Sequence, residues 1–105
     1  MSKLNEKQIE LIGRGNHQEI MGYIAQNRLC EEAEIKLLCR GNHEEIMAYI
    51  GRRSLTGQAQ GLLVENGNHE EIMAYIRRHN FTDENAIAIL HERNNIEELI
   101  AFGER

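Results

Sequence analysis

The chain lacks several residue types and patterns, and each absence narrows the structures open to it. Its 105 residues include no proline, no tryptophan and only three tyrosines and two phenylalanines. No run of about 18 apolar residues occurs, which excludes a bilayer-spanning helix. The opening segment, residues 1–7, is polar and lacks the apolar core of a secretion signal. We therefore expect one domain over residues 1–105, located in the cytoplasm and without a membrane partner.

Cysteine is scarce as well, since Cys30 and Cys39 are the only two. If one helix spans both, they lie about 13 Å from each other, well beyond the reach of a disulfide bond. We predict two reduced cysteines without a shared role. The alternative is an intermolecular bridge or a reactive thiol.

Excess positive charge is also missing, because 12 lysines and arginines stand against 17 aspartates and glutamates, for a net charge of −5. Nucleic acids and anionic membranes attract proteins with an excess of lysine and arginine. The composition therefore disfavours both partners, while a local basic strip stays open as an alternative.

What the chain does contain is an internal repeat. The nine residues Asn42–Ile50 recur unchanged at Asn68–Ile76, 26 positions later. A third copy, Asn16–Ile24, differs at two positions, and a divergent fourth, Asn95–Phe102, follows after 27 positions. Repeats of this length form stacked units that bury a core only against their neighbours. The sequence therefore predicts an all-α solenoid of four two-helix units, at residues 4–27, 30–53, 56–79 and 82–103.

The unit at 30–53 shows how the helices are delimited. Arg40 ends a first helix, Gly41 can take the left-handed closing conformation, and Asn42 then stands at an N-cap position. Glu45 is expected to complete a capping box with Asn42. The same reading predicts caps at Thr56 and Thr82 and eight helices, at about 5–13, 17–27, 31–40, 43–53, 57–65, 69–79, 83–93 and 96–103.

Isolated helices of about ten residues rarely persist in water, so stacking must stabilise them. Positions that stay apolar in all four units are expected to form the core. They are Leu11, Leu37, Leu63 and Ile89; Ile12, Leu38, Val64 and Leu90; Ile20, Ile46, Ile72 and Leu99; and Tyr23, Tyr49, Tyr75 and Phe102.

The turn at Gly41 and Asn42 and the two-helix unit resemble the α-solenoid class, to which HEAT and tetratricopeptide repeats belong. The likeness covers nearly the whole chain and is one of plan. The early Trp and Leu-Gly of tetratricopeptide units are missing, and 26 residues is shorter than HEAT units of about 40. The resemblance implies a protein that binds other macromolecules along one face rather than an enzyme.

The predicted helix at 57–65 departs from its neighbours because it contains two glycines. Gly57 and Gly61 each cost about 1 kcal/mol relative to alanine in a helix interior. Gly61 also stands where other units have Ile35 and Ile87. We predict drift within a duplicated unit, and the alternatives are a hinge or a close approach by a partner.

His17, His43 and His69 occupy the same place in three units, just inside the second helices. Packed helices lie about 8 to 10 Å apart, so histidines of neighbouring units cannot ligate one metal ion. Each histidine also precedes a methionine by four residues, a pair that suits a soft ion such as Cu(I). The divergent unit has Ile96 and Ile100 at the two positions, which favours packing or hydrogen bonding at the turn. Partner binding is the second hypothesis and metal binding the third.

Glutamate pairs open three of the second helices, and the arginine pairs Arg52–Arg53 and Arg77–Arg78 are expected to end the second helices of two units. Adjacent helix residues point about 100° apart, so the paired glutamates are expected to cap helices rather than to act in acid-base catalysis. The arginines are predicted to be solvated. The alternative is an arginine strip for an acidic protein or a phosphate backbone.

These patterns favour a non-enzymatic protein-interaction or scaffold module, with no catalytic residue, metal or cofactor. The alternatives are a nucleic-acid-binding repeat that uses the arginine edge and self-association through the terminal units. The candidate partner-binding residues are His17, His43, His69, Arg52, Arg53, Arg77 and Arg78.

Overall fold

The computed structural model describes residues 3–103, which form eight helices and, within that range, no strand. The predicted all-α fold is therefore confirmed. Each of the four units has a first (A) helix and a second (B) helix. The A helices are α1 (Lys3–Arg14), α3 (Glu31–Arg40), α5 (Gly57–Asn66) and α7 (Glu84–Arg93). The B helices are α2 (His17–Ile24), α4 (His43–Ile50), α6 (His69–Arg78) and α8 (Ile96–Gly103).

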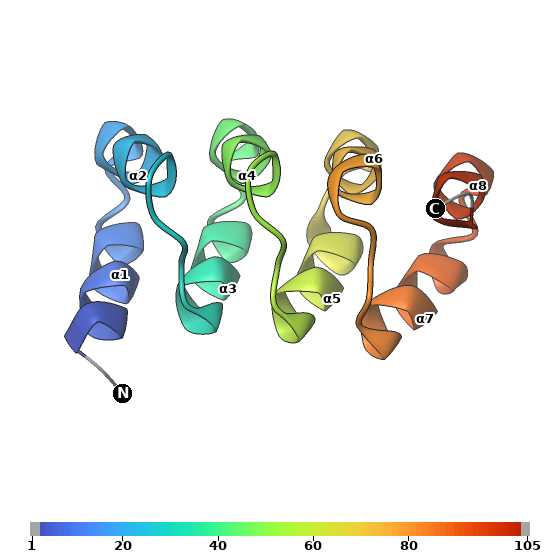
Figure 1. Cartoon of the computed structure of the whole chain (residues 1–105), viewed down its shortest axis with the longest axis horizontal. Helices are drawn as coiled ribbons and strands as arrows, with labels where there is room; N and C mark the ends of the chain where they lie inside the picture. Colours follow the sequence, from blue (N-terminus) through green and yellow to red (C-terminus); the bar gives the residue numbers. More distant parts are fainter. Residues whose placement is uncertain (1–2, 104–105) are drawn as a thin grey trace.

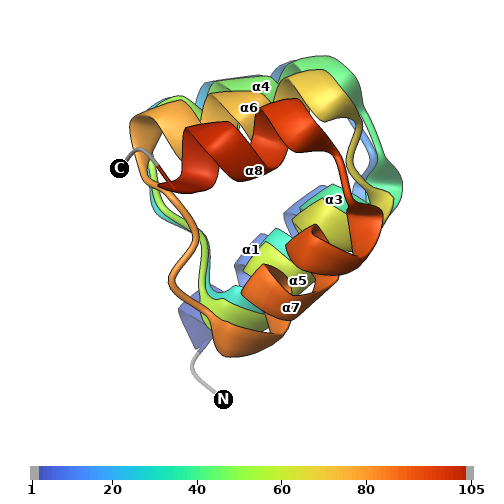
Figure 2. The same ribbon diagram turned by 90° about the vertical axis from the view of Figure 1, so that its right-hand side faces the viewer.

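The helices are arranged in two rows, one of A helices and one of B helices (Figure 1). Each A helix packs beside the A helix of the next unit, and each B helix packs beside the next B helix. Seen along the stack, the four units nearly superpose (Figure 2). The molecule measures 40 × 25 × 19 Å, as a short solenoid should. None of the helices in residues 3–103 is long and apolar enough to cross a membrane.

Short turns join the A and B helices, and the predicted left-handed glycine is present. Gly41 has φ of 73°, and the Asn42 side chain accepts a hydrogen bond from the Glu45 backbone N–H at 3.0 Å. The predicted capping box at Asn42 is wrong, however, because the Glu45 carboxylate turns to Arg40 instead. A complete capping box forms one unit later, at Asn68.

Longer extended loops return from the B row to the A row, and they shorten two B helices relative to the prediction. Helices α2 and α4 end at Ile24 and Ile50 rather than near residues 27 and 53. The loops bury one large apolar side chain in each case: Leu29, Leu55 and Phe81 are 2 to 4% exposed. These side chains join the core whether the preceding B helix ends early, as α2 and α4 do, or continues to Arg78, as α6 does.

Unit 4 is shifted by one residue relative to the prediction. Helix α7 starts 27 positions after α5, and its N-cap is Asp83, whose side chain accepts from the Ala86 N–H at 3.1 Å. The expected cap at Thr82 is therefore wrong, and the extra residue lies in the loop before α7. With this register Leu90, which is fully buried, is the equivalent of Leu63.

Most of the predicted core is buried, including Tyr49 and Tyr75 at 0% exposure. The exceptions lie in units 1 and 4, each of which packs against a single unit within residues 3–103. The half-buried members are Leu11, Tyr23, Ile89, Leu99 and Phe102. The prediction omitted a further buried row at the ends of the B helices, formed by Ile24, Ile50 and Ile76.

Candidate protein-interaction site

The histidines at the starts of α2, α4 and α6 all reach the following unit. His17 Nδ1 lies 2.7 Å from Glu45 Oε2, and its Nε2 lies 2.6 Å from Glu44 Oε1. The equivalent pairs are His43 with Glu71 and Glu70, both at 2.6 Å, and His69 with Glu98 at 2.8 Å. We call these contacts the His–Glu links. They tie each unit to the next through one exposed and one buried carboxylate.

The protonation of the histidines follows from their partners. The hydrogen bond to Glu45, with a second to Glu44, raises the pKa of His17 above its ordinary value of 6.5. The hydrogen bond to Glu71 raises the pKa of His43 in the same way, although burial opposes it. An imidazolium donates from both ring nitrogens, so it satisfies two carboxylates at once. The links of His17 and His43 therefore favour the charged form of these two histidines.

The buried carboxylates of units 2 and 4 have a second cation beside them. Burial acts to raise the pKa of Glu45, but hydrogen bonds from Arg40 and His17 outweigh it and lower the pKa below its ordinary 4.5. The Arg40 Nε lies 2.7 Å from Glu45 Oε1. Glu98 has the same surroundings, with Arg93 at 2.8 Å, and its pKa is also lowered against the effect of burial.

A second set of contacts joins the A helices. Gln8, Glu34 and Gln60 are nearly or fully buried, and each accepts a backbone N–H at the start of the next A helix. The donors are Cys30 at 2.7 Å, Thr56 at 3.0 Å and Thr82 at 2.9 Å. We call these the N-cap links. They satisfy the backbone N–H groups of Cys30 and Thr56, N-cap residues whose own side chains form no capping hydrogen bond.

Sequence reasoning missed both sets of links. The signal was present in part, because a long polar side chain recurs at positions 8, 34 and 60, every 26 residues. The second glutamate of each pair was assigned to helix capping, whereas Glu45 and Glu98 are completely buried and bind the preceding unit. Both sets hold the units together and leave other surfaces open to a partner.

The predicted partner-binding histidines remain partly accessible. The side chains of His17, His43 and His69 are 38 to 45% exposed, although their ring nitrogens contact glutamates of the chain. Their role toward a partner stays a prediction. Within residues 3–103 no group of three ligating side chains is placed to hold a metal ion. Cys30, half-buried, and Cys39, exposed, are both free thiols.

The predicted arginines lie at the far ends of the B helices. Arg77 and Arg78 complete α6 and are exposed, while Arg52 and Arg53 follow the end of α4. Arg52 is exposed, whereas Arg53 is half-buried with an Nε atom that has no hydrogen-bond partner. Because α4 and α6 pack side by side, the four arginines share one edge of the molecule. An arginine edge at this end of the B row stays a prediction as a binding surface.

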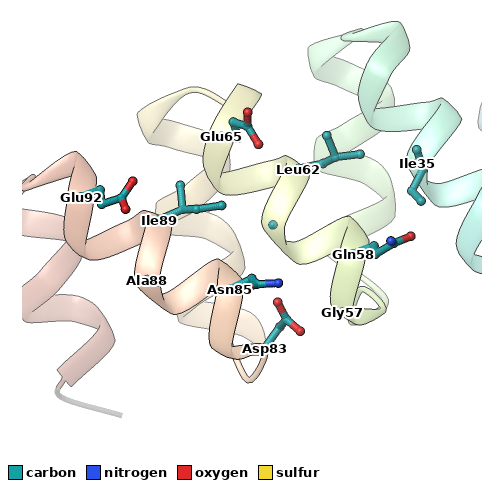
Figure 3. Close-up of a pocket in the computed structure, with 11 residues that line it drawn as sticks. Ile35, Gly57, Gln58, Leu62, Glu65, Asp83, Asn85, Ala88, Ile89 and Glu92 are labelled. Carbon is teal, nitrogen blue, oxygen red and sulfur yellow. The ribbon is translucent and has the colours of Figure 1, made fainter.

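A groove on the A row was not predicted as such. It has a volume of about 550 Å³ and runs over α5 toward α7, with one wall from α3 (Figure 3). Its lining includes three apolar side chains, Ile35, Leu62 and Ile89, one from each of the three helices. We call this hollow the A-face groove.

Glycine creates the groove. Gly61 stands at the position of Ile35 in unit 2, and a Cβ atom at Gly61 would have no other atom within 4 Å. Leu62, its neighbour, replaces the charged Lys36 of unit 2, which adds apolar surface beside the gap. Helix α5, which the sequence distinguishes by its two glycines, is thus the helix over which the groove opens.

The charge around the groove is negative. Glu65, Asp83 and Glu92 line it, and no lysine or arginine does. Asp83 is partly engaged in capping α7. Glu65 and Glu92 are exposed, and neither forms an ion pair with any side chain in the described part of the chain. The groove therefore offers two free carboxylates beside an apolar floor.

No protein-family model, curated protein or solved structure matches the chain. The function is therefore inferred from the arrangement of its own residues.

Proposed function

We propose that the protein is a non-enzymatic interaction module that binds a basic amphipathic helix of a partner protein in the A-face groove. The observation that carries this proposal is the hollow at Gly61, which has apolar walls and a rim of carboxylates without a lining cation. The shape of the groove and the charge of its rim then indicate which kind of partner it binds.

The shape favours an apolar side chain. The space above Gly61 is open, and the half-buried side chains of Ile35, Leu62 and Ile89 surround it. An aliphatic or aromatic side chain that enters this space removes apolar surface from water on both partners. Such a buried anchor is what concentrates binding energy at protein interfaces.

The rim favours a basic partner. Lysine or arginine beside the anchor would meet Glu65 and Glu92, which have no cation of their own in residues 3–103. Complementary charge increases the association rate and rejects acidic partners. The net charge of −5 acts in the same direction at longer range.

A helix suits the groove better than an extended strand. Residues 3–103 contain no strand, so no sheet edge is present to pair with an extended peptide backbone. A helix satisfies its own backbone hydrogen bonds and presents anchors at i, i+3, i+4 and i+7. The missing Cβ at Gly61 also lets a helix approach closely.

Catalysis is not part of the proposal. Glu65 and Glu92 lie exposed on the rim, and the proposal assigns them recognition of positive charge rather than acid-base chemistry. The apolar walls and free carboxylates are what a recognition surface needs.

Binding of labelled designed helices tests the proposal by fluorescence anisotropy. The probes are an amphipathic Leu/Lys helix, the same helix with Glu in place of Lys, and a scrambled Leu/Lys sequence without an apolar face. We expect the first helix to bind best, with weaker affinity as salt rises. The variant Gly61→Leu fills the groove and should weaken binding by about tenfold or more.

Gly22→Leu is the matched control, since Gly22 is a helical glycine of α2 with the same open surroundings, away from the groove. It should bind like the wild-type chain. The double variant Glu65→Lys and Glu92→Lys should transfer preference to the Glu helix. Equal binding of all three probes, or binding unchanged by Gly61→Leu, would contradict the proposal.

A further inference from the structure

Unit 4 differs from the other units at the positions that form the two kinds of link to a following unit. With the register set by α7, Ile87 stands at the position of Gln60, which forms an N-cap link. Ile96 stands at the position of His69, which forms a His–Glu link. Unit 4 therefore carries neither link, and isoleucine replaces the polar residue in both cases.

The result is an apolar outer face on unit 4 of the described chain. Ile96 is 71% exposed and Ile100 is 53% exposed, and with Leu4 they are the exposed large apolar residues of the described part of the chain. Ile100 itself stands at the position of Met73, which is buried in unit 3. Figure 2 looks onto this end, with α7 and α8 nearest the viewer. We call this surface the C-terminal end face, with Ile87, Ile96 and Ile100 as its defining residues.

The opposite end of the solenoid has a different character. Its equivalent of the buried Glu45 and Glu98 is Glu19, which is 54% exposed and lies 4.0 Å from Arg14. If another copy stacked head to tail, this carboxylate would face Ile96 instead of a histidine. Burying a carboxylate against an apolar side chain costs free energy that no new hydrogen bond offsets. Head-to-tail stacking is therefore disfavoured.

We infer that the C-terminal end face pairs with the same face of a second copy of the chain. In such a two-fold dimer the isoleucines of each copy meet an apolar surface of the partner, and Glu19 at the opposite end stays exposed. The contact continues the side-by-side packing that joins the units within one chain. It involves none of the residues that line the A-face groove.

The size of the face sets the strength of the dimer. The two shorter dimensions of the molecule, 25 and 19 Å, limit the face to about 500 Å² per copy. Specific stable complexes bury about 800 Å² per partner, and weak ones bury less. The expected dimer is therefore weak, with a dissociation constant on the order of tens to hundreds of micromolar.

Sedimentation velocity of the full chain over a wide concentration range tests this inference. The weight-average mass of the wild-type chain should rise toward that of a dimer and no further. The double variant Ile96→Gln and Ile100→Gln should remain monomeric at the same concentrations. Leu4→Gln is the control, because it removes an equally exposed apolar side chain from α1 at the other end, and it should dimerise like the wild type.

A cross-link identifies which faces meet. In a Cys30→Thr and Cys39→Ser background, Ile96→Cys should be joined into a covalent dimer by a long flexible bis-maleimide, because a two-fold contact over a face of 25 by 19 Å keeps both copies of position 96 within its reach. A wild-type chain that stays monomeric at concentrations on the order of 1 mM overturns the inference. So does growth beyond the dimer, loss of dimer in Leu4→Gln, or absence of the cross-link.

Discussion

Units 2 and 3 contain the same nine residues in their B helices, Asn42–Ile50 and Asn68–Ile76, yet the structure treats them differently. Helix α4 has 8 residues and α6 has 10. The shared glutamate binds His17 and Arg40 in unit 2, whereas in unit 3 it binds His43 and closes the capping box.

The cause of the different glutamate contacts lies at the end of the preceding A helix. Unit 2 has Arg40 there, and the turn passes through left-handed Gly41. Unit 3 has Asn66 instead, and Gly67 is extended, with φ of −75° and ψ of 161°. Without an arginine to hold it, Glu71 turns to the N–H of its own N-cap. Identical sequences thus differ in their hydrogen bonds because their neighbours differ.

The largest expected effect comes from neutralising the shared glutamate in each unit. Glu45→Gln leaves Arg40 and His17 without their carboxylate in a buried site and should lower the free energy of unfolding by about 3 kcal/mol. Glu71→Gln loses one histidine contact and one cap contact, for about 1 kcal/mol. Urea unfolding measures both.

The control for that pair of variants is Glu44→Gln. The Glu44 side chain is 70% exposed, so this substitution should change the free energy of unfolding by about 0.5 kcal/mol or less. Equal losses for Glu45→Gln and Glu71→Gln would show that the arginine does not distinguish the units.

The two turn glycines should respond differently to asparagine. Gly41 is left-handed, and Asn94 occupies the same place in unit 4 with φ of 54°, so Gly41→Asn should cost only about 0.5 kcal/mol. At Gly67 a Cβ atom would lie 2.4 Å from the Leu63 carbonyl oxygen, so Gly67→Asn should cost about 2 kcal/mol. Thermal unfolding ranks the variants, and equal costs or the reverse ranking would contradict the conformations assigned to the two turns.

The smallest effect is the pH dependence of the His–Glu links. The pKa values of His17 and His43 are raised in the folded chain, so their stabilisation is fully present below the ordinary value of 6.5 and is lost as pH rises through the folded pKa. The pKa of Glu45 is lowered, so its stabilisation is present above 4.5 and is lost as pH falls through the folded pKa.

We therefore expect maximum stability between about pH 4.5 and 6.5, measured as the urea midpoint across pH. The double variant His17→Asn and His43→Asn should lose most of the decrease in urea midpoint that the wild-type chain shows above about pH 6.5. A wild-type midpoint that rises steadily above pH 6.5 would contradict the assigned protonation.

Much of the fold followed from the repeat. The copies of Asn42–Ile50 predicted four units, and Gly41 with Asn42 placed the turn between the helices, because capping depends on a few adjacent residues. The burial of Tyr49 and Tyr75 followed from helical periodicity. The one-residue shift at Asp83 escaped prediction because both registers place apolar residues on the same part of α7.

Less of the candidate site could be predicted from the sequence. Gly61 was recognised as unusual, but only the packing of α3, α5 and α7 shows that its missing side chain opens a groove. The burial of Glu45 was also missed, since paired glutamates at a helix start are ordinarily solvated. Its position depends on Arg40 and on a histidine 28 residues away.

Taken alone, the sequence determined the number of units, their helices and the residues that form the core, because each depends on local capping and on a regular apolar pattern. Tertiary structure decided which glutamate of a pair is buried, where the groove opens and which end of the solenoid is apolar. These depend on what an adjacent unit places against each side chain, since burial and hydrogen bonding are set by contacts between segments about 26 residues apart.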